Sequence, residues 1–359
     1  MTRPTTTGKA QDLITFTRST TGTYLGSDGL LKSAAINEAR IEYDASGNCL
    51  GLLVEEARTN QATHSEDLTV SAWGLMPNSF RNSTNSIAPD GTAGATRFYT
   101  NSNVLAFLQQ ICPGSVGAKT HIVSCWARAT NAGADQTFRL KDTHLGVTDF
   151  YSDNKTATSE WQRFIFTTTF ISASNTAVIA GIVEDSSANQ FDIEVWGMQV
   201  EFDTSFPTSY IPTSGSAVTR AADIATLAVS EFGYNQDQGT VFINCLIVER
   251  PSTNRRVIDG ANNNKRWMYV NSPDNNYGLK YYDGTNNITL VNSGIPLNMK
   301  AAVAVTPTQV FGAANSSAVG SGAHNGDLLD IIQFNFFHNL TGHIKSIQYY
   351  PLRLSNAQL

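Results

Sequence analysis

The hydrophobic and polar positions along the chain alternate in the manner of short β-strands. From Ile14 to Arg18 apolar and polar residues alternate, which is the period of a half-buried strand. Similar segments recur over residues 59–205 and 227–359, separated by turn signals such as Pro89-Asp90-Gly91 and Asp283-Gly284. The spacing predicts an all-β chain with two antiparallel β-sandwiches of the jelly-roll type in series.

Two other regions differ in character from these strand-rich parts. Residues 1–58 are interpreted as an extended N-terminal lead-in or attachment segment. Residues 206–226 contain Pro207 and Pro212 and little periodicity, which predicts an extended linker. We expect this linker to lie on a protein surface, because Tyr210 and Ile211 need cover. The predicted domains are therefore 1–58, 59–205, 206–226 and 227–359.

The composition supports a β-rich fold and excludes several classes of protein. Only 15% of the 359 residues are charged, against about 25% in an average domain, while glycine occurs 27 times. Thr, Asn and Gly are poor helix formers, and the heptads of a coiled coil are missing. The net charge of −6 and the lack of a basic run beyond Arg255-Arg256 argue against nucleic-acid binding. No apolar stretch approaches the length of a membrane span, and we expect no membrane insertion and no secretory signal.

Three stretches between residues 14 and 223 form a recurring pattern. The first comprises Phe16-Thr17-Arg18-Ser19, Tyr24, Asp28-Gly29-Leu30, Arg40 and the run from Gly51 to Asn60, which reads GLLVEEARTN. The second is Ser65-Glu66-Asp67-Leu68 with Ala72-Trp73. The third comprises Val195 to Glu201 (VWGMQVE), Thr208 to Thr213 (TSYIPT) and Val218 to Asp223 (VTRAAD). In this order they resemble structural proteins of tailed bacteriophages that carry a carbohydrate-binding-module-like jelly roll.

The C-terminal region is similar to a laminin-G or concanavalin-like sandwich, on the basis of its ending from Gly342 to Pro351 with Arg353-Leu354-Ser355. Together the two resemblances imply a virion protein of the tail-fibre, spike or head-appendage type, made in the host cytoplasm and assembled onto the particle. They also imply other virion proteins as partners and a homo-oligomer, with a trimer favoured.

Catalytic motifs are poorly supported by the sequence. Asp192 and Glu194 lie on one face of a predicted strand, as in the E-x-D-x-E pattern of concanavalin-like glycosidases. The leading position is Gln190, however, and an amide cannot serve as the carboxylate nucleophile. No G-x-S-x-G elbow is present either. We therefore expect no enzyme activity, and a polysaccharide depolymerase is the most distant alternative.

A glycan-binding site is expected in the second sandwich. Aromatic and polar side chains are concentrated there, as a sugar site requires: Trp267, Tyr269, Tyr277, Tyr281 and Asp283. Because aromatic residues are also common in β-sheets, the same pattern is compatible with ordinary packing.

No cofactor is expected. The four cysteines and six histidines lack metal-binding spacing, and the cysteines are interpreted as buried free thiols. A structural calcium ion is compatible with such sandwiches, with loop carboxylates as ligands, but no DxDxDG string assigns a site. The loop positions considered are Asp67, Asp90, Asp185, Asp274 and Asp283.

Two functions remain open on this reading. The first is a compact structural component of a virion, such as a decoration protein or short fibre, that also binds host surface glycans. The second is a dedicated receptor-binding fibre or spike that recognises a surface polysaccharide.

Overall fold

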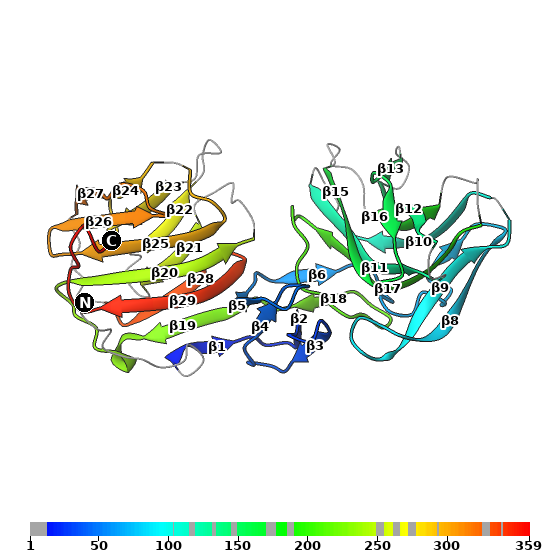
Figure 1. The fold of residues 1–359 in the computed structure, drawn as a ribbon, viewed down its shortest axis with the longest axis horizontal. Coiled ribbons are helices and arrows are strands. Elements are labelled where there is room, and N and C mark those ends of the chain that lie inside the picture. Colours follow the sequence, from blue (N-terminus) through cyan, green and yellow to red (C-terminus); the bar gives the residue numbers. More distant parts are fainter. Residues whose placement is uncertain are drawn as a thin grey trace.

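The chain folds into two β-sandwich lobes joined by a narrower waist (Figure 1). The computed structural model describes residues 13–102, 104–114, 119–130, 134–144, 149–169, 177–184, 190–248, 255–260, 266–271, 278–292, 294–324, 331–338 and 340–359. These residues form 29 strands and one short 3-10 helix, Val229–Glu231. The predicted all-β fold of antiparallel sandwiches is confirmed. No helix among these residues is long and apolar enough to cross a membrane.

The first sandwich contains a six-stranded and a five-stranded antiparallel sheet. The six-stranded sheet has the order β13 (Asp149–Tyr151), β12 (Gln136–His144), β16 (Ala177–Glu184), β10 (Ala106–Pro113) and β7 (Gly74–Leu75), with β14 (Lys155–Ala157) also paired to β12. The five-stranded sheet has the order β15 (Gln162–Thr169), β11 (Thr120–Ala129), β17 (Asp192–Phe202), β9 (Ala93–Thr100) and β8 (Ser79–Ile87). Alternate residues of these strands point inward and form one buried core.

The second sandwich contains two seven-stranded sheets. One has the order β1 (Thr15–Thr17), β19 (Ile224–Ala228), β28 (Gln333–His338), β21 (Arg255–Gly260), β22 (Arg266–Asn271), β23 (Gly278–Tyr282) and β24 (Asn287–Val291). The other has the order β27 (Gly320–Ala323), β26 (Gln309–Ala314), β25 (Asn298–Val305), β20 (Gly239–Ile247), β29 (Gly342–Tyr350), β5 (Cys49–Val54) and β4 (Ile41–Tyr43).

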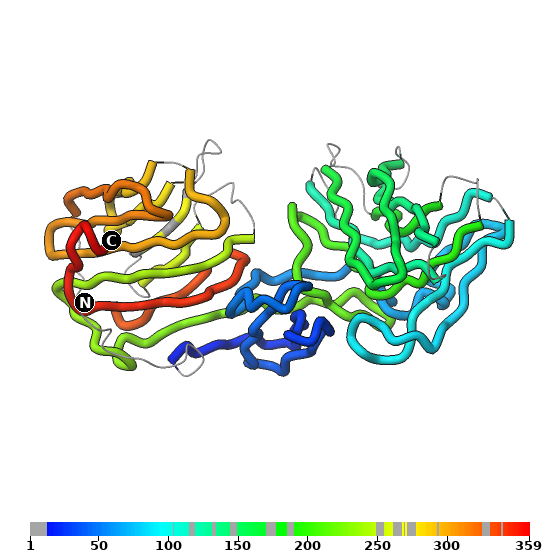
Figure 2. Tube along the Cα trace, viewed as in Figure 1, coloured from blue at the N-terminus to red at the C-terminus, as the bar shows by residue number. Residues whose placement is uncertain are grey.

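The N-terminal segment is therefore an integral part of the second sandwich. The prediction of a separate lead-in over residues 1–58 is wrong, because β1, β4 and β5 extend the two seven-stranded sheets at their edges. Phe16, Leu52 and Val54 from this segment are buried in the core of that sandwich. The hairpin of β2 (Gly22–Leu25) and β3 (Leu31–Ala34) lies at the waist, beside the first sandwich (Figure 2).

The predicted linker over residues 206–226 is covered by the chain itself. Tyr210 and Ile211 are only 2% and 3% exposed, as expected for a segment that lies on a protein surface. Its last residues form β18 (Val218–Arg220) and the start of β19. Phe16, Tyr210 and Ile211 therefore do not require the surface of another subunit.

Two short strands connect the lobes. β6 (Arg58–Asn60) leads the chain into the first sandwich, and β18 brings it back, with Asn60 opposite Val218. Residues 61–217 are thus inserted between two segments that both belong to the second sandwich. We refer to the paired strands β6 and β18 as the neck.

Candidate functional site: the junction and the open face

The residues predicted to bind glycan do not form one surface site. Tyr281 is completely buried in the core of the second sandwich, so the prediction that its ring stacks on a sugar is wrong. Asp283 is also buried, and its carboxylate accepts hydrogen bonds from the backbone N–H groups of Thr285 and Asn286 in a turn. Trp267 and Tyr269 lie on β22, but their side chains are outside the described part of the structure, as is Tyr277.

The carboxylates considered for catalysis are both ion-paired. Asp192 accepts two hydrogen bonds from Arg97, at 2.8 and 2.6 Å. Glu194 accepts a hydrogen bond of 2.8 Å from Nε of Arg128. This arrangement matches a strand with a polar outer face.

The candidate calcium ligands are used in local turns. Asp67 and Asp90 accept hydrogen bonds from Thr69 and Thr92, two residues further along the chain. Asp185 and Asp274 lie outside the described residues. Among the described residues there is no group of three or more His, Cys, Asp or Glu side chains that could hold a metal ion.

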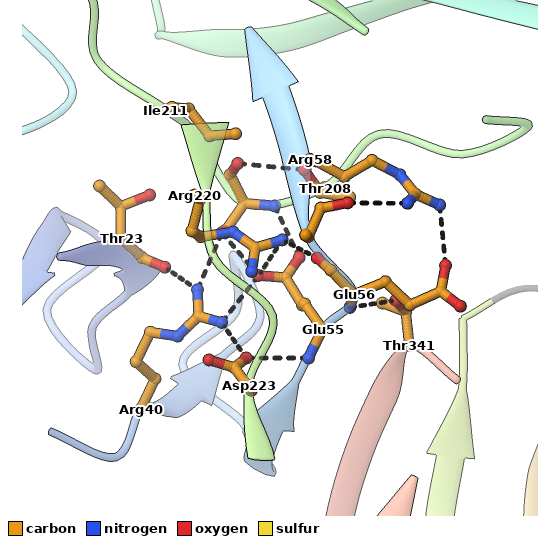
Figure 3. A network of polar contacts seen from close by, with 12 residues as sticks. Thr23, Arg40, Glu55, Glu56, Arg58, Thr208, Ile211, Arg220, Asp223 and Thr341 are labelled. Carbon is orange, nitrogen blue, oxygen red and sulfur yellow. Dashed lines mark hydrogen bonds and ion pairs between the residues drawn. The ribbon is translucent and has the colours of Figure 1, made fainter. Parts of the chain in front are cut away.

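Residues from the first and third sequence stretches described above meet at the waist, in a cluster that we call the junction (Figure 3). Its charged members come from four separate parts of the chain and are all at least 90% buried: Arg18, Arg40, Glu55, Arg220 and Asp223. Because their partners are far apart in sequence, this clustering was not visible in the sequence.

Asp223 and Glu55 hold the junction together. Asp223 pairs with Nη1 of Arg18 at 3.1 Å and with Nη2 of Arg40, and it accepts a hydrogen bond of 2.8 Å from the backbone N–H of Glu55. Glu55 pairs with Arg40 at 2.8 Å and with Arg220 at 3.4 Å. Nearly every carboxylate lone pair therefore has a donor, as a buried charge requires.

The junction also ties the first sandwich to the second. Ser209, which precedes the buried Tyr210, donates hydrogen bonds from its backbone N–H and its hydroxyl to Glu55, at 2.8 and 2.6 Å. Asn60 in the neck donates to the carbonyls of Met198 and Ile211 and accepts from the N–H groups of Ala62 and Val200. Apart from the local bond between Ala62 and Asn60, these contacts join segments that are distant in the chain.

The electrostatics of the junction favour ionised carboxylates. Burial raises the pKa of Glu55, but Arg220, Arg40 and the hydrogen bonds from Ser209 outweigh it and lower the pKa to about 2. Because these side chains are inaccessible to a ligand, the junction is a structural site that fixes the two lobes relative to one another.

A second cluster lies on the outer surface of the six-stranded sheet. Phe138, Leu140 and their neighbours on β10 and β16 point into the core, so the alternate residues point outward. The outward set, which we call the open face, consists of Phe107, Gln109, Ile111, Arg139, Lys141, Asp149, Tyr151 and Ile179. Ile111 is 56% exposed and Tyr151 is 36% exposed, so this surface is accessible to solvent.

The open face combines aromatic rings with hydrogen-bonding groups. In the strand register Gln109 is opposite Gly181, which is opposite Lys141, which is opposite Tyr151. The Lys141 ammonium lies 5.9 Å from the ring centroids of both Phe107 and Tyr151, and 3.3 Å from Asp149. The guanidinium of Arg139 lies 4.8 Å from the Tyr151 ring centroid.

The Tyr151 ring is held in place at its hydroxyl end. Its hydroxyl donates a hydrogen bond of 2.7 Å to Asp149. Burial and this hydrogen bond raise the pKa of Tyr151 to about 12, so the phenol remains neutral at physiological pH. A fixed ring with exposed surface and polar neighbours can stack on one face of a sugar.

The comparisons with known proteins give similarity in fold alone. No family model and no curated protein matches the chain. The CBM22-1 xylan-binding domain of Xyn10C from Paenibacillus barcinonensis is 9% identical, with 42% of this chain and 99% of that chain covered and a TM-score of 0.34. The CBM22-1–CBM22-2 tandem domain of the same protein is 10% identical, with 82% and 98% covered and a TM-score of 0.33.

A phage protein is also among the similar structures. The enzymatically active domain of tailspike protein 4 of bacteriophage CBA120 is 11% identical, with 40% of this chain and 21% of that chain covered and a TM-score of 0.30. The chain is thus similar in sandwich architecture to carbohydrate-binding modules. At these identities and TM-scores, the similarity carries no argument about what it binds.

Sequence reasoning missed the open face for a simple reason. The sequence pattern predicts a strand from Thr137 to Leu140, which lies within β12, but the prediction stops short of Lys141. Which side of a strand remains uncovered depends on distant segments, and no local pattern reports it.

Proposed function

We propose that the protein is a non-enzymatic structural component of a bacteriophage virion that binds a surface polysaccharide through the open face of its first sandwich. The observation that carries the binding part is the cluster of exposed aromatic rings and charged side chains around Tyr151. Binding sites usually combine apolar or aromatic surface with a few convergent polar groups. The open face has this composition on a rigid sheet.

The charges of the open face favour an acidic polysaccharide. Arg139 and Lys141 are positive, and Asp149 is the single carboxylate in the set. Tyr151 and Phe107 can stack on sugar rings, and the half-buried guanidinium of Arg139 would pair with a carboxylate of the ligand. The Lys141 ammonium is buried and paired with Asp149, and it adds positive charge beneath this surface.

The virion part of the proposal rests on the sequence resemblance. The junction gives that resemblance a physical role, because the residues that carry it hold two sandwiches in one fixed arrangement. A particle appendage needs such rigidity to present a binding surface at a constant position. Assembly as a homo-oligomer, with a trimer favoured, and contact with other virion proteins belong to this proposal.

The test is affinity electrophoresis of the full chain in native gels that contain purified acidic or neutral bacterial polysaccharides. We expect at least one acidic polysaccharide to retard the protein, and Tyr151→Ala to weaken that binding by about tenfold, because a stacking aromatic contributes more than about 1 kcal/mol.

The matched control is Phe80→Ala, which removes a 40% exposed aromatic ring from the opposite sheet of the same sandwich. It should leave the retardation unchanged. Equal binding by Tyr151→Ala and the wild type, or no retardation by any polysaccharide, would contradict glycan binding at the open face.

A further inference from the structure

A groove of about 800 Å³ lies between the N-terminal segment and the outer surface of the five-stranded sheet. We call it the waist groove and define it by Tyr24, Tyr43, Trp126, Arg128, Trp161 and Arg163, all of which are half-buried. Its size lies within the range of ordinary small-ligand pockets, about 300–1,000 Å³. It is on the side of the first sandwich opposite the open face, so the two surfaces are separate.

One wall of the groove is formed by the first sandwich and carries two fixed tryptophans. Trp161 donates a hydrogen bond of 2.9 Å from its indole N–H to the carbonyl of Ile87, and the guanidinium of Arg128 lies 4.9 Å from its ring. Trp126 packs edge-on against Tyr210 at 5.4 Å, with Arg163 at 4.7 Å from its ring. Both rings are therefore oriented before any ligand arrives.

The other wall is formed by residues at β2 and β4. Tyr24 lies on β2, and Glu42 and Tyr43 lie on β4, so this wall adds two more aromatic rings. Glu42 is held by a 2.6 Å contact with His343 and by the backbone N–H of Leu25 at 3.3 Å. Aromatic side chains thus face the groove from both sides.

The two arginines that line the groove are held by other groups of the protein. Arg128 donates a hydrogen bond of 2.8 Å to Glu194, and Arg163 donates to the carbonyl of Thr208 at 2.9 Å and to the hydroxyl of Ser124 at 3.1 Å. Gln162 is exposed at the rim and can exchange hydrogen bonds with hydroxyl groups. The hydrogen bonds of Arg163 go to neutral groups, but Glu201, Glu55 and Glu42 lie near enough to compensate its charge. An ionic ligand therefore finds little uncompensated charge, whereas a neutral polyhydroxylated ligand finds rings to stack on.

We propose that the waist groove binds a neutral oligosaccharide about the size of a di- or trisaccharide. The sugar rings stack against Trp161 and the tyrosines of the opposite wall, and their hydroxyls bond at the rim. This site is independent of the proposed function of the open face, because it lies on the opposite side of the sandwich and selects uncharged ligands.

The experiment titrates the full chain with neutral cello-, xylo-, malto- and chito-oligosaccharides while tryptophan emission is recorded. We expect at least one series to shift the emission. We expect Trp161→Ala and Tyr43→Ala, which change opposite walls, each to weaken that binding about tenfold. Tyr151→Ala on the open face should bind as the wild type does.

Three results would overturn the proposal. They are no emission change with any neutral series at millimolar concentration, wild-type affinity in both groove variants, and loss of the response in Tyr151→Ala. If circular dichroism shows that Trp161→Ala is unfolded, Tyr43→Ala alone decides. If Tyr151→Ala loses its binding to acidic polysaccharide, that result concerns the open face alone and does not bear on the waist groove.

Discussion

At the scale of single residues, the buried carboxylate of Glu55 is a critical charge of the junction. It is 3% exposed and is surrounded by Arg40, Arg220 and Ser209. Removing one partner from a buried ion pair typically costs about 3–5 kcal/mol, because the remaining charge loses its counter-charge in a poorly solvating environment. The junction therefore makes stability depend on the ionisation of this carboxylate.

We expect Glu55→Gln to lower the free energy of unfolding by about 3 kcal/mol or more at pH 7. The difference from the wild type should shrink as the pH falls from about 4.5 towards 2. The folded-state pKa of Glu55 is lowered to about 2, so the unfolded chain takes up this proton first on acidification. Urea titrations of both proteins from pH 7 to pH 3 measure the difference.

The control for this prediction is Asp28→Asn. Asp28 pairs with Lys32 at 2.6 Å, but its side chain is 49% exposed, and such surface pairs contribute little to stability. A loss of stability in Asp28→Asn equal to that in Glu55→Gln would show that burial of the junction is not the cause. A pH-independent difference would show that the Glu55 pKa is not lowered.

Strand β17 shows how one element serves both the core of the first sandwich and a small aromatic cluster on its outer side. Ile193 and Val195 point into the core before a bulge, and Met198 and Val200 do so after it, so Trp196 can face the small aromatic cluster with Tyr210. Gly197 has a φ of 66° at the bulge, and a Cβ there would lie 2.8 Å from the Trp126 ring. Both the backbone conformation and the close ring favour glycine.

We expect Gly197→Ala to destabilise the protein by about 2–4 kcal/mol, combining left-handed backbone strain with overpacking against Trp126. Gly29→Ala is the matched control, because Gly29 has a φ of 76° with no atom within 4 Å of the built Cβ. It should cost only about 1 kcal/mol of strain. Chemical denaturation measures both, and equal losses would rule out a steric contribution from Trp126.

The strands themselves could be predicted from the sequence, whereas several of their partners could not. Alternation over β11, β17 and β20 is a local property and was readable. The pairing of β5 with β29, at Val54 opposite Gly342, brings together distant parts of the chain. No local sequence pattern predicts such a pairing. The N-terminal segment was therefore predicted to be an attachment segment, although its strands extend the two sheets of the second sandwich.

The predicted site residues failed for the same reason. Tyr281 was chosen as an aromatic residue in a polar, loop-rich region, but its strand alternates so that this ring faces the core. Trp126 and Trp161 lie at strands, where packing is the ordinary role of an aromatic residue, yet they line a groove whose second wall comes from the N-terminal segment. Burial of an aromatic side chain depends on tertiary contacts.

At the scale of the whole molecule, the second sandwich depends on the first 58 residues. We expect the fragment 224–359 to be insoluble or unfolded, because it lacks β1, β4 and β5 and exposes the core contacts of Phe16, Leu52 and Val54. The control fragment 59–217 retains all the strands of the first sandwich and should fold. Far-UV circular dichroism and cooperative melting distinguish the two, and a cooperatively folded 224–359 fragment would contradict the prediction.

The neck also determines how mechanical load passes through the molecule. The first sandwich is held by β6 and β18, which leave the second sandwich side by side. A pull on a ligand held by the first sandwich, with the second sandwich anchored, is shared between two backbone strands and the charged contacts beside them. A pull between β1 and the C-terminal strand β29 acts within the second sandwich and bypasses the inserted one. The first sandwich can therefore remain folded while tension between these strands disturbs the second sandwich that supports it.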